Sequence, residues 1–570
     1  MILIGAVCLA TGLAIALLWL PRSAPDLSAY KFTPVSRQGA TERDPDWSPD
    51  GKSITFAANV HGIDQAFTKA IDSPDTAQIT HSASNCRSPF WSRDGATIYY
   101  FSQNAMWAVP ASGGPAEVVL DNTMGATVHP NGQTVVFVRD GKLWIASLKG
   151  EQPREFAEAR FAATSLVEHQ LKFLPDGSKL IAFTGTDIWI LQFPSGTPRK
   201  VPGTFSSTTM VTWCPDSRHV VEMHYSSTYI LSLMDTSDGS RQVIYSTPEP
   251  LLPGSVSRDW KRIAYTTGQA EWDVLEISLP SGAVSTRMHG SGVICWSPDW
   301  APSGTHYLAS TNRSGTFAVE DISATEFFSR RLVVAEANQL GFGRARWAPD
   351  RSRFVFMDLL RQGGSRLMVS NSAGGRPTVL DADVGPVALS ASWSPDGQWV
   401  VYARRQAGKA QLVKLRPGAG TAPVALTDLA ILDWLNYPTP QWSPDGNWIA
   451  YPAPDGLELI SPNGKTTRKL TTRKLQVFGF SREGGQLFGI FHNTTVEGAQ
   501  WQLYSVDLRT GAEKLLGPVD LPASTESLAG FSLHPDGKRF LMSIGKLSFD
   551  IWMLEGFDQH KSWLKPVLRR

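Results

Sequence analysis

Short hydrophobic runs separated by polar turns make up most of the chain after residue 30. Residues 53–57, 179–183 and 399–403 are rich in β-branched and aromatic side chains, which is typical of buried β-strands. A second run follows after a short turn, as at residues 142–146 and 550–554. Long amphipathic helical patterns are absent after residue 20, so the pattern predicts an all-β protein and excludes folds that alternate strands and helices.

The same turn precedes each pair of strands. It reads Trp-Ser-Pro-Asp-Gly at residues 47–51. Proline presets φ, aspartate can accept from its own downstream backbone N–H, and glycine supplies positive φ, so the motif predicts a turn between two strands. Complete or degenerate copies occur at residues 91–95, 129–132, 174–177, 213–216, 257–259, 296–299, 347–350, 393–397, 442–446, 481–484 and 534–537.

The spacing of these copies predicts the architecture. Twelve copies between Asp50 and Asp536 give eleven intervals over 486 residues, a mean of about 44 residues, which is typical of four-stranded propeller blades. We therefore predict two tandem β-propellers of about twelve blades, six plus six, over residues 30–286 and 287–570, with seven plus five left open. Residues 30–36 resemble an outer strand without its own blade, and we expect them to close the first ring against the sixth copy.

The N-terminus carries a possible targeting segment. Residues 2–20 are uncharged and apolar, about the length of a membrane-spanning helix. A basic start and a small-x-small cleavage site are both missing, which favours an uncleaved transmembrane anchor over residues 1–21 and a linker over residues 22–29. Acylation of Cys8 is disfavoured by the preceding Val7 and the short leader. Arg22 alone favours a cytoplasmic position for the chain that follows it.

Charge and cysteine content narrow the classes of function. Lys+Arg is 53 and Asp+Glu is 52, for a formal net charge of +1, which argues against nucleic-acid binding. Cys86, Cys214 and Cys295 are too few and too widely spaced for a disulfide framework or a zinc site. The 20 tryptophans indicate large side chains packed between repeated layers.

The repeated polar residues have a structural and a chemical interpretation. Asp50, Asp396 and Asp445 recur at equivalent places, which favours turn capping over calcium binding or acid–base catalysis, because a catalytic carboxylate pair must converge on one bond. His129 and His534 precede the proline of their turns and are interpreted as structural. We predict no catalytic residue, metal ligand or cofactor site.

Motifs of propeller-associated enzymes are incomplete. A Gly-x-Ser-x-Gly nucleophile elbow is approached only at residues 479–483 and 530–534, and both segments lack the final glycine. The sequence therefore predicts a protein that is not an enzyme. An enzymatic site assembled from scattered residues in a propeller channel stays open. Residues 300–304 and the long interval from Glu483 to Asp536 are the expected positions of binding loops.

With the repeat in view, the chain resembles the TolB-type, WD-like β-propeller family. Residues 109–114, 193–199 and 310–315 are also similar to the extracytoplasmic propeller halves of membrane-anchored bacterial Ser/Thr kinases and winged-helix regulators. This resemblance implies a membrane-anchored protein whose propellers lie in the periplasm. The repeat occurs in proteins of very different activity, so it does not imply one function.

These observations lead to one functional hypothesis and two rivals. We expect a non-catalytic sensor or scaffold, held at the membrane by one N-terminal helix, that binds a protein partner or a small ligand at a propeller face. The rivals are a TolB-type accessory protein of an envelope complex and a hydrolase or lactonase with its site in a propeller channel.

Overall fold

All regular elements of the described residues are β-strands. The protein is described by a computed structural model in which 47 strands form eleven hydrogen-bonded sheets over the described part of the chain. The described residues are 27–557, except 37–40, 61–62, 124, 140–141, 149–151, 157–170, 184–186, 204–209, 226–227, 280, 291, 327, 361–363, 386–389, 407–408, 419, 430–438, 454, 494–499 and 523. The prediction of an all-β propeller protein is confirmed.

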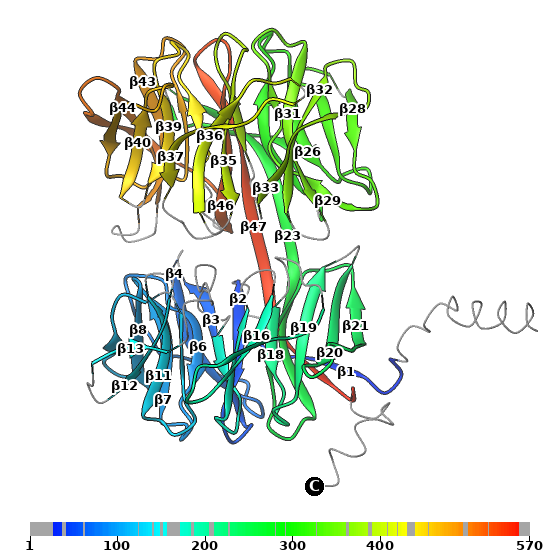
Figure 1. Ribbon diagram of the computed structural model, residues 1–570, viewed down its shortest axis with the longest axis vertical. Helices are drawn as coiled ribbons and strands as arrows, with labels where there is room; N and C mark the ends of the chain where they lie inside the picture. Colours follow the sequence, from blue (N-terminus) through cyan, green and yellow to red (C-terminus); the bar gives the residue numbers. More distant parts are fainter. Residues whose placement is uncertain are drawn as a thin grey trace, which may run out of the picture.

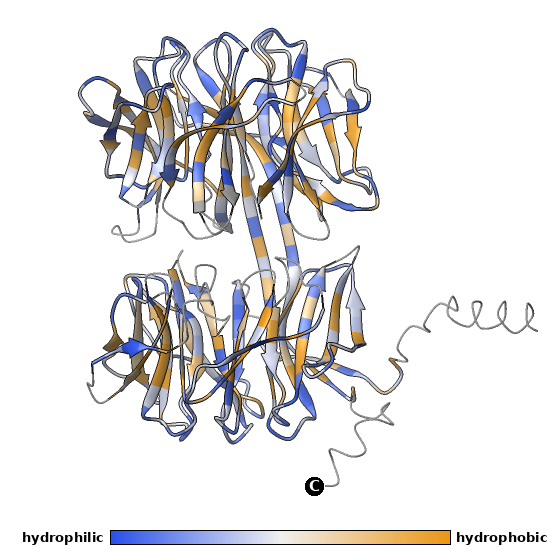
Figure 2. Cartoon of the chain, in the orientation of Figure 1, coloured by the Kyte–Doolittle hydropathy of each residue, from blue (hydrophilic) through white to orange (hydrophobic). Residues whose placement is uncertain are grey.

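Two propellers are stacked along the long axis of the molecule and joined by two long strands, β23 (Arg262–Ser278) and β47 (Arg539–Glu555) (Figure 1). Figure 2 shows hydrophobic residues concentrated on the strands of both propellers and polar residues at their turns. Because β23 and β47 belong to both propellers, we refer to the sheet that contains them as the shared sheet.

The first propeller has five sheets of its own, with innermost strands β2, β6, β10, β14 and β18. Its strands are β1 Lys31–Pro34, β2 Glu42–Trp47, β3 Ser53–Val60, β4 Ile63–Ala70, β5 Thr76–Gln78, β6 Arg87–Trp91, β7 Thr97–Ser102, β8 Ala105–Pro110, β9 Glu117–Leu120, β10 Gly125–Val128, β11 Thr134–Arg139, β12 Lys142–Ser147, β13 Arg154–Glu155, β14 Leu171–Phe173, β15 Lys179–Phe183, β16 Ile188–Gln192, β17 Pro198–Lys200, β18 Met210–Trp213, β19 His219–Tyr225, β20 Tyr229–Asp235, β21 Arg241–Thr247 and β22 Leu251–Val256.

The second propeller also has five sheets of its own within the described residues. Its strands are β24 Val284–Met288, β25 Cys295–Trp300, β26 His306–Thr311, β27 Ala318–Ser323, β28 Ser329–Val334, β29 Gln339–Phe342, β30 Arg346–Trp347, β31 Arg353–Leu360, β32 Ser365–Asn371, β33 Thr378–Gly385, β34 Ala391–Trp393, β35 Val400–Gln406, β36 Lys409–Leu415, β37 Val424–Leu429, β38 Gln441–Trp442, β39 Ile449–Ala453, β40 Gly456–Ile460, β41 Thr467–Thr471, β42 Val477–Phe480, β43 Gln486–Asn493, β44 Gln500–Asp507, β45 Glu513–Val519 and β46 Thr525–Leu533.

The shared sheet supplies the sixth blade of each propeller. β23 and β47 pair antiparallel over their whole lengths, from Arg262 opposite Glu555 to Ser278 opposite Arg539. In the first propeller the order is β22, β23, β47, β1, and in the second it is β46, β47, β23, β24. Contacts of β22 with β2 and of β46 with β25 close the two rings. Each ring is thus closed by strands from both halves of the chain.

Two glycines allow the long strands to approach each other between the propellers. A Cβ on Gly268 would lie 1.9 Å from the carbonyl oxygen of Ser548, and one on Gly545 would lie 2.9 Å from the Trp272 ring. Gly268 pairs with Phe549, and Gly545 pairs with Trp272. The two glycine–aromatic pairs lie symmetrically about the centre of the ladder, which indicates a local twofold relation between the propellers. Aromatic side chains opposite strand glycines cover the exposed backbone.

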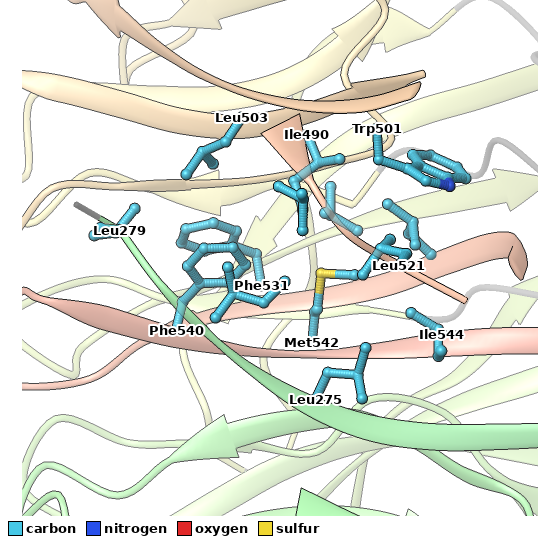
Figure 3. Close-up of a cluster of buried hydrophobic side chains, with 14 residues drawn as sticks. Leu275, Leu279, Ile490, Trp501, Leu503, Leu521, Phe531, Phe540, Met542 and Ile544 are labelled. Atoms are coloured by element: carbon cyan, nitrogen blue, oxygen red, sulfur yellow. The ribbon is translucent and has the colours of Figure 1, made fainter. Parts of the chain in front are cut away.

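The hydrophobic cores also combine strands from both halves of the chain. Leu275 and Ile277 of β23 pack in the second propeller with Phe540 and Met542 of β47 and with Val477, and Figure 3 shows this cluster. The rings of Phe531 and Phe540 stack there with centroids 4.3 Å apart.

Ile551 and Met553, near the C-terminal end of β47, are buried instead in the first propeller with Trp47, Phe56 and Ala264. One strand therefore contributes to two cores. After the other strands of the second propeller, β47 runs back into the first propeller.

The predicted division of the chain into two propellers between residues 286 and 287 stays a prediction.

Two details of the predicted repeat are wrong. The seventh turn is not at residues 296–299, which lie in β25, but at residues 300–304, where Gly304 N donates to Ala301 O. The segment interpreted as an inserted binding loop is therefore the turn itself. The predicted closing strand, β1, is the outer strand of the sixth blade of the first propeller as expected, but its partner there is β47 and not a strand of the sixth copy, because β47 occupies the third position of that blade.

The predicted transmembrane helix and membrane location require correction. In the described residues, no helix is long and apolar enough to cross a membrane. Residues 1–21 and most of the predicted linker, residues 22–26, lie outside the described residues. Over the described residues the fold class is therefore all-β propeller, and the predicted membrane-anchored, periplasmic location is withdrawn.

Because β23 and β47 contribute side chains to the cores of both propellers, we predict different effects for substitutions at their two ends. Ile551→Ala should destabilise the first propeller and Ile277→Ala the second, each by about 3 kcal/mol, because each leaves a cavity in a fully buried cluster. Hydrogen exchange followed by mass spectrometry should show the larger loss of protection around Phe56 for Ile551→Ala and around Val477 for Ile277→Ala. Loss of protection in the second propeller alone for both variants would contradict the contribution of β47 to the core of the first propeller.

Candidate functional site

The channel of the first propeller contains a cavity of about 250 Å³. Its walls are largely apolar and include Phe90, Phe173 and Met210 from three innermost strands. The turn prolines Pro130 and Pro175 also line it, so the cavity lies toward the face that carries the turns. An apolar cavity with a few convergent polar groups is the usual form of a ligand site.

An acid and a base lie across this cavity. The carboxylate of Asp46, on β2, is 3.9 Å from Nζ of Lys172, on β14. It also accepts a hydrogen bond of 3.2 Å from Trp91 N. Burial raises the pKa of Asp46, while Lys172 acts in the opposite direction. At the mouth, the Arg93 guanidinium donates to Pro175 O at 3.1 Å, so a side chain from one blade reaches the turn of another.

The channel of the second propeller contains a cavity of about 370 Å³ whose charged residues are already paired. Arg346 Nη1 donates to Asp299 Oδ1 at 2.6 Å. The other oxygen, Asp299 Oδ2, accepts from Trp347 N at 2.9 Å, and Ser532 Oγ donates to Oδ1 at 3.0 Å. All of these groups come from innermost strands or the residues beside them.

A recurring bond joins neighbouring blades in both rings. The residue before the first position of each turn motif, which we call the latch position, accepts a hydrogen bond through its side chain from a backbone N–H of the next blade. The bonds are Trp47 N to Ser255, Trp91 N to Asp46, Phe173 N to Thr127, Trp300 N to Ser532, Trp347 N to Asp299 and Trp442 N to Ser392. Sequence reasoning missed these acceptors, of which Asp46, Asp299 and Ser392 directly precede a tryptophan.

The turn aspartates cap their own turns, as predicted. Asp50 Oδ1 accepts from Ser48 Oγ at 2.6 Å and from Lys52 N at 3.0 Å. Asp396 and Asp445 make the same contacts in their own turns. The structure does not bring these three carboxylates to one point.

The two histidines of the motif form matched contacts. His129 Nδ1 accepts from Asn131 N at 3.0 Å, so Nε2 carries the proton and donates to Gly177 O at 3.1 Å. His534 likewise accepts from Asp536 N and lies 3.1 Å from Gly304 O. The structural interpretation of both residues is therefore confirmed, because each ties its turn to the next blade.

The serines of the incomplete nucleophile elbows are in structural positions. Ser481 Oγ accepts from Gln486 N at 3.1 Å within its turn. Ser532 bridges Trp300 N and Asp299. Over the part of the chain that the structure describes, no group of three or more His, Cys, Asp or Glu residues could hold a metal ion. That the protein lacks catalytic, metal and cofactor sites stays a prediction.

The capped carboxylates predict a stability that falls in acid. The Ser48, Ser92 and Ser394 hydroxyls lower the pKa of Asp50, Asp94 and Asp396. A folded-state pKa below the unfolded value adds stability that is complete above the unfolded pKa, about 3.8, and is lost as pH falls through the folded pKa. The free energy of unfolding should therefore decrease as pH is lowered from about 4.

Ser394→Ala tests the cap directly. Loss of its bonds to Asp396 and Trp399 N should lower the free energy of unfolding by about 1 kcal/mol at pH 7 and by less at an acid pH below the lowered pKa of Asp396, where this carboxyl group is protonated. Urea unfolding at both pH values measures this difference. An equal loss at the two pH values would contradict the role of the ionised carboxylate.

Comparisons with known proteins agree with the repeat. Residues 218–479 match the family model for the TolB beta propeller domain. An uncharacterized protein of Agrobacterium fabrum is 33% identical over 99 residues, which are 16% of this chain and 34% of that protein. The aligned region thus spans about a third of the relative.

Two solved structures are similar over about half of the chain. A protein described as a TolB from Agrobacterium tumefaciens has 16% identity and a TM-score of 0.39, covering 49% of this chain and 100% of that one. TolB from Acinetobacter baumannii has 16% identity and a TM-score of 0.23, covering 51% and 76%. These TM-scores are too low to transfer an activity. What the comparisons support is a similarity of residues 218–479 to the TolB beta propeller domain.

Proposed function

We propose that the protein is a non-catalytic binding module and that the first channel binds a small ligand or a short segment of a protein partner. The observation that carries this proposal is the Asp46–Lys172 pair in a cavity that combines apolar walls with polar groups. Phe90, Phe173 and Met210 offer apolar surface, whereas the pair offers one acceptor and one donor of opposite charge. Such a site orients a ligand by its polar group.

The geometry of the pair supports a role in binding. At 3.9 Å the two charged groups are in weak contact, so a polar ligand atom beside the pair can contact both groups without breaking a short bond. Burial disfavours the ionised form of Asp46, and a donor or cation on the ligand would offset this effect. The latch bond from Trp91 N holds the carboxylate in place.

The structural relatives and the chain's own residues leave the partner open. A sensor or scaffold role, a TolB-type accessory role and the resemblance to kinase or winged-helix regulators stay predictions. A channel-sited hydrolase would need Asp46 or Lys172 to act on a bound substrate. Turnover of a channel ligand that is lost in Asp46→Asn would contradict the proposal of a non-catalytic module.

A bulky substitution in the channel tests the proposal. Met210→Trp should fill part of the cavity of about 250 Å³ and weaken binding at least tenfold. Val118→Trp is the matched control, because Val118 lies on the outer strand β9 and is 50% exposed. Ligands recovered with wild-type protein are identified by mass spectrometry, and their affinities for the three proteins are measured by calorimetry.

Circular dichroism and thermal unfolding check that both variants fold. Retention of wild-type affinity by Met210→Trp would overturn the assignment of the site to the first channel. Equal weakening by Val118→Trp would do so as well, because that side chain is far from the channel in its blade.

A further inference from the structure

Arg344 lies at a position of the second propeller that faces the channel. In four blades the innermost strand has a β-bulge just before the latch position. The register shifts between Arg43 and Asp46, Arg87 and Phe90, and Trp296 and Asp299, and one extra residue likewise lies between Gly343, whose N–H donates to Met357 O, and Arg346, which pairs with Val355. The second residue of each interval, which we call the bulge position, is Asp44, Ser88, Ser297 or Arg344. Bulges redirect side chains, and Asp44 and Ser88 line the first cavity.

The neighbours of Arg344 support this orientation. Phe342 and Ala345 are buried in a cluster between blades, whereas Arg346 lines the channel. Because successive side chains of a strand alternate between its two sides, Arg344 lies on the side opposite Ala345, which is the channel side that Arg346 lines. Arg344 is not among the residues that line the cavity of about 370 Å³ itself but stands two residues before Arg346 on the same strand segment.

Among the described residues, Arg344 forms no hydrogen bond or ion pair. The carboxylate that lines the same channel, Asp299, is already bound by Arg346, Ser532 and Trp347 N. Burial and the neighbouring Arg346 lower the pKa of Arg344 to about 9, so the group is still a cation at neutral pH. Removing a charge from water is costly unless an opposite charge or hydrogen bonds compensate it.

The first propeller has a carboxylate at the bulge positions, and the corresponding positions of the second propeller hold a hydroxyl group and a cation. At its bulge positions, Asp44 accepts a hydrogen bond from Ser88 of the next blade at 3.1 Å. In the second propeller the corresponding residues are Ser297 and Arg344. The carboxylate is replaced by a hydroxyl and the hydroxyl by a cation, so the polarity of this layer is reversed between the two channels.

We propose that the channel of the second propeller binds a small oxyanion, a carboxylate or a phosphate, at Arg344. The guanidinium fork matches the two oxygens of either group. Ser297, Ser390 and Thr439 stand two residues before the latch position in three other blades, as Arg344 does in its own, and offer hydroxyl groups at the equivalent sequence position. The cavity of about 370 Å³ on the turn-bearing side gives space for a small molecule to enter. This site is separate from the first channel and does not depend on what that channel binds.

Titration with simple anions tests the proposal and separates the two sources of oxygen ligands. Inorganic phosphate and succinate are each titrated by calorimetry into full-length protein in a buffer without other oxyanions. We expect saturable one-to-one binding of at least one probe to the wild type. Arg344→Gln should weaken it at least tenfold, and Arg344→Lys should retain part of it, because the charge remains.

Arg331→Gln is the matched control, since Arg331 is exposed on the outer strand β28 and its loss changes the net charge equally. It should bind like the wild type. Absence of saturable binding of both probes to the wild type would overturn the proposal. Unchanged binding in Arg344→Gln, or equal weakening in Arg331→Gln, would overturn it too. If Arg344→Gln fails to fold, Arg344→Lys alone decides the outcome. Partial retention of binding at neutral pH, with release of the anion at high pH where the lysine is neutral, supports the site, and retention at high pH contradicts it.

Discussion

The antiparallel pairing of β23 with β47 is the interaction on which the rest of the structure depends. It is one ladder of seventeen residue pairs that passes from the sixth blade of one propeller to the sixth blade of the other. Neither ring has a complete sixth blade without both strands. Propellers usually protect their sheet edges by closing the ring, and here both closures depend on the same two strands.

This pairing also determines which faces of the propellers meet. β22 leads into β23 through the turn at residues 257–261, and β46 leads into β47 through the turn at residues 534–537. Because β23 and β47 each run from their own turn toward the other propeller, the turn-bearing faces point away from each other. Near the shared sheet, Arg43 of the first propeller forms an ion pair of 2.6 Å with Glu526 of the second. The two cavities, which are lined by turn prolines, therefore lie toward opposite ends of the molecule.

The local repeat could be predicted from the sequence because its chemistry is local. Proline, aspartate and glycine specify the turn within five residues, and the hydrophobic runs at residues 53–57 and 179–183 are the strands β3 and β15. The pairing of β1 with β47 could not be predicted, since residues more than five hundred positions apart carry no local signal of their contact. The seventh turn was misplaced because Trp296-Ser297-Pro298-Asp299 matches the motif better than the real turn at residues 300–304 does.

The channel residues were missed for a different reason. Asp46 and Lys172 precede the turn aromatics of blades on different sides of the ring, and only the closed ring brings them within 3.9 Å. Arg344 was missed because its bulge shifts the alternation of the strand by one residue. An alignment of the twelve repeats by the position before tryptophan would show both layers, but not which of their charges remain unpaired.

Cysteine crosslinking across the shared sheet tests the central claim most directly. Gln269 and Ser548 are exposed and lie opposite each other in the ladder, where Cα atoms are close enough for a disulfide. In a Cys8→Ser background, Gln269→Cys with Ser548→Cys should form an intramolecular disulfide, detected by mass spectrometry of the linked peptides. Gln269→Cys with Asp550→Cys, which would meet only after a two-residue slip, should form far less. Equal crosslinking of both pairs, or none in the first, would contradict the shared sheet.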